Sequence, residues 1–350
     1  FGRVILRKEP GLERCQVVIG KDTRVSGYML ESALEAGLVA SGVDVKLLGP
    51  MPTPAVAMLT HSLGANAGIV ISASHNIYSD NGLKFFGADG EKISDEDEFA
   101  IEAELREELS TVSSFSLGKA NRVDDATELY IEFCKSTVSR DFDLSGMRIA
   151  LDCANGATYH VAPQIFSELG AELFCLGVNP DGFNINRDVG STSISALAHT
   201  VKSNSFDLGI AFDGDGDRVL FVDSAGNLVD GDQLLYLLAI ENLSSGERGG
   251  VVGTEMSNLG LEKALADAGI DFCRANVGDR YVKKMMRERG WNLGGESSGH
   301  IICGDVATTG DGIVGALQIL KSLNRSSSSL FQNLSSMEKH PQHLINLPID

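Results

Sequence analysis

The chain has 350 residues, of which 43% are hydrophobic and 22% are charged. This is the composition of a globular protein and excludes a largely disordered one. Because 29 Lys and Arg stand against 48 Asp and Glu, the formal net charge is −19. Such a charge repels nucleic acids and anionic membrane surfaces, so we expect neither as a partner. Any phosphorylated ligand must then be held by local cations or a metal ion.

No membrane anchor and no secretion signal is predicted. The longest apolar runs, such as 234–240, are far shorter than the ~20 residues of a membrane-spanning helix. No charged segment followed by an apolar one opens the chain. Six scattered cysteines form no C-x-x-C pair, which favours buried free thiols over a zinc site or a dithiol redox motif. We therefore expect a protein of the reducing cytoplasm.

The first part of the chain alternates short apolar runs with amphipathic stretches. Helical spacing over 26–40 is followed by Gly42, which is typical of the residue after a helix. Ser94 begins an acidic helix that we expect to run to about 109, and another helix covers 127–139. The predicted strands of this part cover 16–20, 43–48 and 67–71. This β-α-β rhythm indicates an α/β fold with mainly parallel sheets.

The same rhythm recurs twice after a polar break at 140–143. In the second round we predict a helix at 162–169. The predicted strands cover 147–152, 171–177, 208–212 and 218–222. A third round runs from 233 through the strand at 249–253 to a helix at 314–323. We predict three consecutive α/β domains with mixed, mainly parallel sheets, covering 1–143, 144–228 and 229–340. Residues 341–350 would begin a fourth domain that is missing.

The loop after the strand 67–71 carries Ser74. A serine at the carboxyl end of a strand in an α/β sheet stands where such proteins bind ligands. It is either a nucleophile that carries a phosphoryl group or part of a polar turn. The surrounding sequence fits neither G-x-S-x-G nor S-x-x-K, which weakens a hydrolase or β-lactamase interpretation.

The aspartate loop, residues 213–217, alternates Asp213, Asp215 and Asp217 with glycines. Three carboxylates so close repel each other without a cation, and hard oxygen ligands suit Mg²⁺ or Ca²⁺. An EF-hand is excluded because Arg218 stands where its glycine should be and Ser224 where its glutamate should be. A phosphate oxygen would fill an open position of the ion, and Arg218 could bind that phosphate through two hydrogen bonds.

The glutamate loop, residues 294–300, contains Glu296, Ser298 and His300 among glycines. One acid, hydroxyls and an imidazole suit the recognition of sugar hydroxyls or an amine, and His300 could act as general acid or base near neutral pH. A plain glycine turn remains equally open for this loop alone. Supporting cations are Arg24 and Lys84, and a helix N-terminus at 277–281 could meet an anion.

Taken together, these loops resemble the α-D-phosphohexomutase superfamily, and within it the bacterial phosphoglucosamine mutases. The resemblance extends over essentially the whole chain. The Ser74 and aspartate loops are typical of the superfamily, whereas 152–159 and 277–282 point to the glucosamine branch. The segments that carry it are 20–24, 50–55, 67–84, 152–159, 209–218, 277–282 and 308–312.

The resemblance implies a role for each candidate residue. Ser74 would be the phosphoserine that donates and recovers the phosphoryl group, and its phosphate and the aspartate loop would bind Mg²⁺. Lys84 would act as general acid or base, with Arg24 and Arg218 beside the phosphoserine. Sugar hydroxyls would be bound by Glu296 and Ser298, with His300 close by. The loop that discriminates among sugars would contain Gly278, Asp279 and Arg280.

The implied reaction interconverts glucosamine 6-phosphate and glucosamine 1-phosphate through a hexosamine 1,6-bisphosphate. This intramolecular phosphotransferase would supply UDP-N-acetylglucosamine synthesis for the bacterial cell wall, as a monomer or homodimer. Phosphoryl transfer relies on positioning and charge neutralisation, which such loops offer. The alternatives are a phosphomannomutase or phosphoglucomutase of the same superfamily, or an inactive Mg²⁺-dependent fragment that binds sugar phosphates.

The sequence departs from the superfamily pattern at three places. Phe1 and Gly2 match only the first two letters of an N-terminal F-G-T-D-G loop. Ile77 replaces the proline usual after Ser-His-Asn. The fourth domain, which grips the substrate's second phosphate in the superfamily, would follow where this chain stops. We therefore expect poor substrate affinity and slow turnover from these 350 residues alone.

Overall fold

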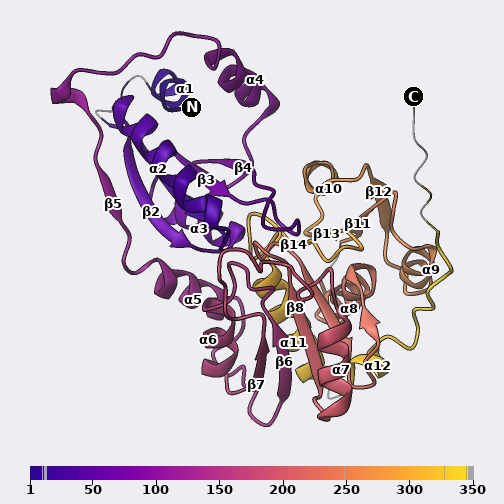
Figure 1. Cartoon of the computed structure of the whole chain (residues 1–350). Coiled ribbons are helices and arrows are strands. Elements are labelled where there is room, and N and C mark those ends of the chain that lie inside the picture. Colours follow the sequence, from indigo (N-terminus) through magenta and orange to yellow (C-terminus); the bar gives the residue numbers. More distant parts are fainter. Residues whose placement is uncertain (10, 12–13, 248, 327, 344, 346–350) are drawn as a thin grey trace.

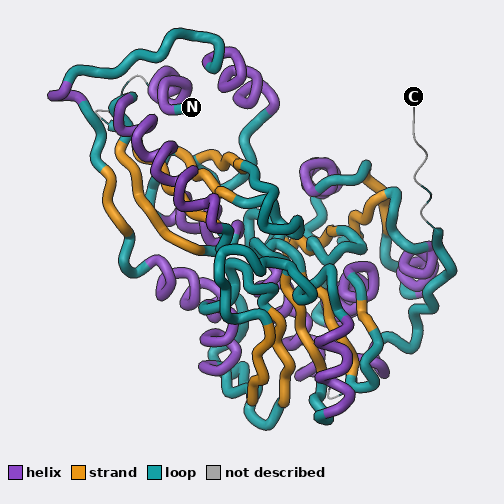
Figure 2. The backbone as a smooth tube through the Cα atoms, viewed as in Figure 1, coloured by secondary structure: helices purple, strands orange, loops and turns teal. Residues whose placement is uncertain are grey.

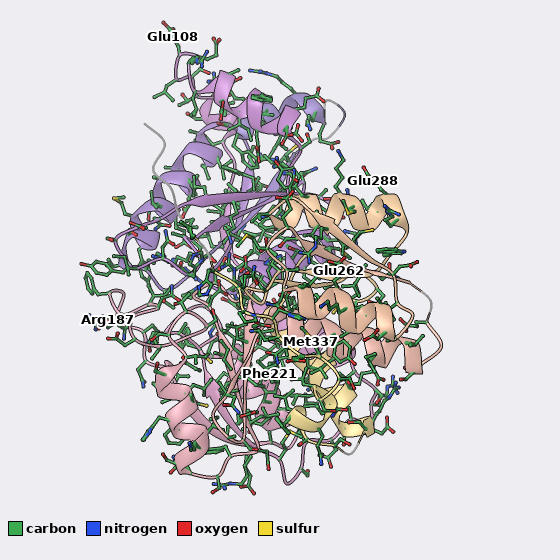
Figure 3. All side chains as sticks on the ribbon, turned by 90° about the vertical axis from the view of Figure 1, so that its right-hand side faces the viewer. Glu108, Arg187, Phe221, Glu262, Glu288 and Met337 are labelled. Carbon is green, nitrogen blue, oxygen red and sulfur yellow. The ribbon has the colours of Figure 1, made fainter. Side chains whose placement is uncertain are left out.

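The structure is a computed structural model that describes residues 1–9, 11, 14–247, 249–326, 328–343 and 345. It contains three sheets, one after another along the chain, with helices packed on them (Figure 1). The side chains fill the spaces between these layers (Figure 3): Phe221 lies inside, whereas Glu108 and Arg187 project from the surface. The loops at the centre of the molecule are where the three sheets approach one another (Figure 2).

The first sheet has the strand order β4-β3-β1-β2-β5. Only β4 runs antiparallel to its neighbour. The strands are β1 (Gln16–Lys21), β2 (Asp44–Pro50), β3 (Ala67–Ile71), β4 (Leu83–Gly87) and β5 (Ala120–Arg122). The helices of this part are α1 (Gly2–Lys8), α2 (Val25–Ala40), α3 (Thr53–Ser62), α4 (Asp95–Glu104), the 3₁₀ helix η1 (Ser114–Ser116) and α5 (Ala126–Ser136).

Two predicted helix ends have different outcomes. The end of α2 is confirmed, since Gly42 adopts the left-handed φ of +88° two residues after Ala40. Ser94 does cap α4, its hydroxyl accepting the N–H of Asp97 at 3.2 Å. The expected end near 109 is wrong, because α4 stops at Glu104. Leu109 is fully exposed, so a longer helix would have no apolar face to bury.

The second sheet has the order β10-β9-β8-β6-β7. Its centre, β6 with β7 and β8, is parallel, and β9 and β10 are added antiparallel. The strands are β6 (Arg148–Asp152), β7 (Glu172–Leu176), β8 (Leu208–Phe212), β9 (Val219–Asp223) and β10 (Leu228–Val229), and the helices are α6 (Val161–Glu168) and α7 (Ser195–Ser203). The last strand extends across the predicted boundary at 228/229.

The third sheet has the order β12-β11-β13-β14, with only β14 antiparallel. Its strands are β11 (Val251–Thr254), β12 (Phe272–Ala275), β13 (Leu293–Gly295) and β14 (Ile301–Cys303). Its helices are α8 (Gly231–Ser244), α9 (Leu259–Asp267), α10 (Asp279–Arg289), α11 (Gly312–Ser326) and α12 (Leu330–Asn333). α11 is buried on nearly all sides and contacts α5, α8 and β9, so one apolar core joins the three parts.

The predicted fold class, three α/β units with mixed and mainly parallel sheets, is confirmed. All six cysteines are free thiols; four are buried, and Cys175 and Cys273 are half-buried. Within the described residues, no helix combines the length and apolarity needed to cross a membrane. Of the predicted start of a fourth domain at 341–350, residues 344 and 346–350 lie outside the described residues. The domain boundaries themselves stay predictions.

Candidate active site

The three loops singled out in the sequence occupy the same place in the three sheets. Each joins a parallel strand to the antiparallel strand that follows it: β3 to β4, β8 to β9 and β13 to β14. The serine loop, defined here as residues 72–80, leaves β3, and the aspartate and glutamate loops leave β8 and β13. Because all three lie at the carboxyl ends of parallel strands, ligand chemistry is expected where they meet.

Ser74 points its hydroxyl at the aspartate loop. Its Oγ donates to Asp213 Oδ2 at 2.7 Å. The residue has a left-handed φ of +51°, which is unusual outside glycine. Its N–H donates to Ser72 Oγ at 2.9 Å, and that hydroxyl donates to Asp22 Oδ2 at 2.6 Å. The serine predicted as nucleophile is therefore fixed beside the predicted metal ligands.

The aspartate loop gathers three buried carboxylates. One oxygen from each of Asp213, Asp215 and Asp217 lies within 4.8 Å of the others. One oxygen each of Asp215 and Asp217 is buried without a hydrogen-bond partner among the described residues. Burial, together with its two neighbours, raises the pKa of Asp213 well above its usual range. These oxygens could hold a metal ion, whose charge would remove the repulsion.

Lys84, at the start of β4, reaches into the same loop. Its Nζ lies 2.6 Å from Asp215 Oδ2 and 3.1 Å from Asp217 Oδ2. Burial alone would lower the pKa of Lys84, but the carboxylates of Asp215 and Asp217 outweigh burial and raise it. The Thr53 hydroxyl also donates to Asp215 Oδ2. Lys84 is thus a charged group in contact with the aspartate loop, as the sequence predicted.

Arg24 and Arg218 do not play equivalent parts. Arg24 is completely buried, and its Nε donates to Asp22 Oδ2 at 2.7 Å. Its other four N–H groups donate to carbonyl oxygens of the serine loop, those of Ser74, Asn76, Ile77 and Asp80. A guanidinium has five N–H donors, so none of Arg24 remains for a phosphate. Its place beside Ser74 fits the prediction, but its contacts are those of a loop-holding residue.

Arg218, unlike Arg24, has unused hydrogen-bonding capacity. Its Nε is buried and has no hydrogen-bond partner among the described residues, and it lies 3.9 Å from Asp217 Oδ1. Its backbone N–H donates to Asp213 Oδ1 at 3.1 Å, which fixes the start of the side chain at the aspartate loop. A half-buried guanidinium in this position is suited to an anion such as a phosphate.

The glutamate loop lies against the N-terminus of α10. Glu296 Oε1 accepts the N–H of Gly278 at 3.0 Å, and Ser298 Oγ lies 3.5 Å from Glu296 Oε2. Gly278 has a φ of +124°, which only glycine adopts readily. The sequence placed these three residues in one sugar-binding group, and the structure brings them together.

His300 connects this group to the aspartate loop. The side chain is buried, with Nδ1 3.8 Å from Asp217 Oδ1 and Nε2 3.7 Å from Asp279 Oδ2. Asp279 is in turn bound by Lys92, whose Nζ lies 2.5 Å from its Oδ2. His300 thus stands between the predicted metal ligand Asp217 and the predicted sugar-binding residue Asp279.

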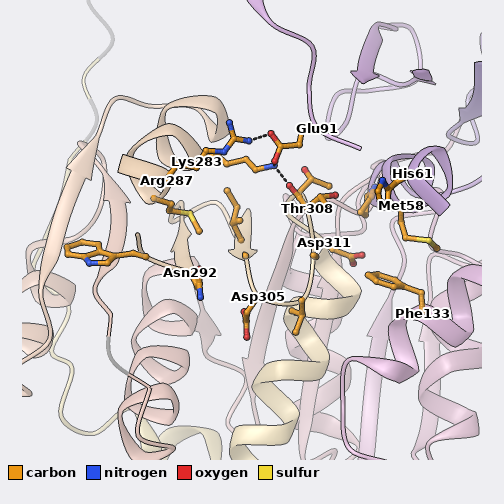
Figure 4. Close-up of a pocket in the computed structure, with 18 of the residues that line it drawn as sticks. Met58, His61, Glu91, Phe133, Lys283, Arg287, Asn292, Asp305, Thr308 and Asp311 are labelled. Carbon is orange, nitrogen blue, oxygen red and sulfur yellow. Dashed lines mark hydrogen bonds and ion pairs between the residues drawn. The ribbon is translucent and has the colours of Figure 1, made fainter. Parts of the chain in front are cut away.

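Arg280 is turned away from this group. Its guanidinium forms ion pairs with Asp95 and, at 2.7 Å, with Glu98, both on α4 of the first unit. The sequence prediction that Arg280 contacts sugar therefore has no support in these contacts. Nearby, a cavity of about 620 Å³ lies between α3 and α10, with Lys283 and Arg287 turned toward Glu91 (Figure 4). None of the predicted site residues lines this cavity.

Four residues of the site were not singled out in the sequence. Asp22 and Thr53 lie in the segments 20–24 and 50–55, which carry the family resemblance, so the resemblance could have indicated them. Lys92 and Asn186 had no such signal. Asn186 donates its amide to the carbonyls of Ser74 and Asn76, both at 2.9 Å, from a different sheet unit.

Comparisons with known sequences support one family. Residues 1–111, 128–226 and 230–340 match α/β/α domains I, II and III of phosphoglucomutase/phosphomannomutase. A phosphoglucosamine mutase of Legionella pneumophila (strain Lens) is 59% identical over 335 residues, which are 95% of this chain and 74% of the relative. One of Aeromonas hydrophila is 59% identical over 333 residues, 95% of this chain and 75% of the relative.

Solved structures agree with this result. A phosphoglucomutase/phosphomannomutase family protein of Burkholderia thailandensis has a TM-score of 0.81 at 26% identity, covering 96% of this chain and 74% of its own. A putative phosphomannomutase of Thermus thermophilus has a TM-score of 0.82 at 26% identity, covering 95% and 76%. The chain spans about three quarters of the length of these relatives. It belongs to the phosphoglucosamine mutase family, within the phosphoglucomutase/phosphomannomutase fold.

Proposed function

We propose that this protein interconverts glucosamine 6-phosphate and glucosamine 1-phosphate through a phosphorylated Ser74. The observation that carries the proposal is the 2.7 Å hydrogen bond from Ser74 Oγ to Asp213, inside a cluster of three buried carboxylates. The relatives named phosphoglucosamine mutase, at 59% identity, support glucosamine as the sugar. The product would feed UDP-N-acetylglucosamine synthesis for the cell wall in the cytoplasm.

The reaction needs two balanced phosphoryl transfers. In the first, the phosphoryl group leaves Ser74 Oγ for a sugar hydroxyl; the sugar loses its proton, and Oγ regains one. The resulting hexosamine 1,6-bisphosphate turns over in the site. In the second transfer, the bond between the other phosphoryl group and its sugar oxygen breaks and a bond to Ser74 Oγ forms; Oγ loses its proton, and the sugar oxygen gains one. The serine is thereby restored to its phosphorylated state.

The residues of this chain divide the work between charge and position. Asp213, Asp215 and Asp217, with the phosphate on Ser74, would hold Mg²⁺, which supplies charge neutralisation during transfer. Lys84, which contacts Asp215 of the aspartate loop, would act as general acid or base, and the buried, unpartnered Nε of Arg218 would bind a phosphate. Glu296 and Ser298 would bind sugar hydroxyls, with His300 between them and the aspartate loop.

The alternative substrates are mannose and glucose phosphates. One observation keeps them in consideration: the solved structure from Thermus thermophilus, at 26% identity, is called a putative phosphomannomutase. The higher identity of the phosphoglucosamine mutases favours the amino sugar. Comparing the rates on glucosamine, glucose and mannose phosphates separates the two, and faster turnover of mannose phosphate would reject glucosamine.

The central experiment follows the phosphate on the serine. The chain is incubated with Mg²⁺ and glucosamine 1,6-bisphosphate, and intact-mass and peptide spectra are recorded with time. We expect one phosphoryl group on Ser74, none in Ser74→Ala, and normal labelling in Ser79→Ala, an exposed serine of the same loop. Chelating Mg²⁺ should slow labelling by roughly 100-fold. Labelling that survives Ser74→Ala, or a persistently bare Ser74, would contradict the proposal.

A further inference from the structure

Ser74 is held from two sides. Arg24, in the same sheet unit, donates to the carbonyl oxygens of Ser74 and Asn76 at 3.0 and 2.8 Å. Asn186, between β7 and α7 of the second unit, donates its Nδ2 to the same two oxygens, both at 2.9 Å. Each carbonyl has two lone pairs, so both donors are accommodated at once. The two contacts are therefore additive rather than alternative.

Arg24 and Asn186, together called the clamp here, hold a strained residue. A non-glycine residue in the left-handed region is strained and persists only where its surroundings hold it there. Ser74 has such a φ, +51°, and the clamp grips the carbonyl of that residue itself. We propose that Asn186 is a positioning residue, which holds Ser74 in this conformation so that its Oγ meets Asp213. This inference rests on the proposed function of Ser74 as phosphoryl carrier.

Asn186 is itself rigidly placed. Its side chain is largely buried and its backbone is left-handed, at φ +58°, which asparagine tolerates better than most residues. Its N–H donates to Ala154 O at 2.8 Å. The buried carboxylate of Asp152 accepts the N–H of Ala154 at 2.9 Å. It also accepts, at 2.7 Å, the N–H of Gly190, which follows Asn186 in the same loop. The segment 152–159, which had no assigned role, thus supports the loop that carries Asn186.

The segment 152–159 also contacts the aspartate loop. The N–H of Ala157 donates to Gly214 O at 2.8 Å. A Cβ added to Gly214 would lie 2.6 Å from both Asn186 Nδ2 and Ser74 O, so the aspartate loop approaches the clamp as closely as glycine permits. Arg24 ties the serine loop to its own unit, whereas Asn186 ties it to the unit that carries Asp213. Asn186 is therefore suited to set the distance between Ser74 Oγ and the carboxylates.

Two substitutions remove the clamp without requiring a new backbone. Asn186→Asp keeps the shape and tolerates the left-handed φ, but presents a carboxylate to two carbonyl oxygens. Asn186→Gly keeps the backbone freedom, adds no charge and removes the donor. Asn184→Asp is the matched control, because Asn184 lies on the same loop and donates its amide to Asn179 O at 3.0 Å, away from Ser74.

The readout is the rate of phosphate gain by Ser74 at increasing concentrations of glucosamine 1,6-bisphosphate with Mg²⁺, together with the thermal midpoint. We expect both Asn186 variants to lower the maximal rate by roughly 10–100-fold, since a displacement of about 1 Å has this effect on a reacting group. The half-saturating concentration should stay within about twofold. Asn184→Asp should match the unaltered chain.

Four other outcomes count against the inference. Unchanged maximal rates in both variants would overturn it. A rate loss that follows only the loss of folded protein, or a rise in the half-saturating concentration alone, would assign Asn186 a structural or a binding role instead. If the unaltered chain gains no phosphate, the proposed function fails, and the inference fails with it.

Discussion

Two contacts around the site differ in how deeply their charged side chains are buried. Where the serine loop meets the aspartate loop, Arg24 and Asp213 are completely buried, and the polar contacts converge on Ser74. Where α10 meets α4 of the first unit, the ion pairs of Arg280 are exposed: Arg280 keeps 40% of its side chain accessible and Asp95 keeps 70%. Buried charges require fixed partners, whereas exposed ion pairs contribute little to stability.

The difference corresponds to the two tasks of the proposed reaction. Phosphoryl transfer needs groups held in one geometry, which buried hydrogen-bonded contacts provide. The bisphosphate, in contrast, must turn over without leaving, which is easier where the surrounding contacts exchange readily. We infer that the phosphate end of the site is rigid and that the sugar end is held by weaker contacts.

The largest expected effects test this contrast with two arginines. Arg24→Lys removes a guanidinium whose five N–H groups are all engaged, so we expect the free energy of unfolding to fall by about 3 kcal/mol. Arg218→Lys should leave stability within about 0.5 kcal/mol. Arg218→Lys should slow phosphate gain by Ser74 roughly 100-fold, because it removes the unpartnered Nε that lies 3.9 Å from Asp217 Oδ1. Thermal unfolding and the labelling assay measure both quantities.

The two substitutions serve as controls for each other, since each replaces the same side chain by the same residue. The contrast is wrong if Arg218→Lys destabilises the chain as much as Arg24→Lys does. It is also wrong if Arg24→Lys leaves the free energy of unfolding unchanged, because the five hydrogen bonds of the buried Arg24 would then contribute nothing to the fold.

The two arginines also mark how far the sequence could be read. Apolar runs without polar alternation, such as 67–71, predicted buried strands, and β3 is buried throughout. Asp213, Asp215 and Asp217 were predictable as a cluster because their spacing in one short loop already brings them together. Local pattern therefore predicted buried central strands such as β3 and the aspartate loop, whereas strands such as β4, β5 and β12 were not predicted.

Contacts between distant segments could not be predicted in the same way. The acceptors of Arg24 lie about fifty residues further along the chain, as backbone carbonyls that carry no residue signal. Arg280 pairs with Asp95 of α4, 185 residues away in the sequence, and no sequence pattern near Arg280 indicates that pairing. Asn186 reaches Ser74 from another sheet unit. Their roles depend on how the sheet units pack.

A second prediction tests the buried side through pH. Asp311 caps α11, and the adjacent Gly312 donates its N–H to Gly216 O of the aspartate loop at 3.0 Å. Burial raises the pKa of Asp311 to about 6, against the hydrogen bonds from Val314 N–H and the Tyr130 hydroxyl. Since this pKa lies above the unfolded value, the stabilisation is complete below about pH 4 and is lost as pH rises through 6.

The change Asp311→Asn removes this titration. Between pH 4 and pH 7, the free energy of unfolding of the variant should rise relative to the unaltered chain by up to about 3 kcal/mol. Urea unfolding at several pH values measures the difference between the two chains, in which the other titrating groups cancel. A difference that does not change with pH would mean that Asp311 is not held in a charge-disfavouring environment, and that the buried region is more hydrated than its contacts indicate.

The smallest expected effect concerns the exposed contact. Arg280→Ala breaks the ion pairs with Asp95 and Glu98, which join α10 to α4, and should lower the free energy of unfolding by less than about 1 kcal/mol in low salt. In about 1 M NaCl, where charges are screened within ~3 Å, the difference should disappear. Lys284→Ala is the matched control, since Lys284 is exposed on the same helix and has no ion pair among the described residues. A salt-independent loss from Arg280→Ala would mean that packing rather than charge holds α10 against the first unit, and the sugar end would then be as rigid as the phosphate end.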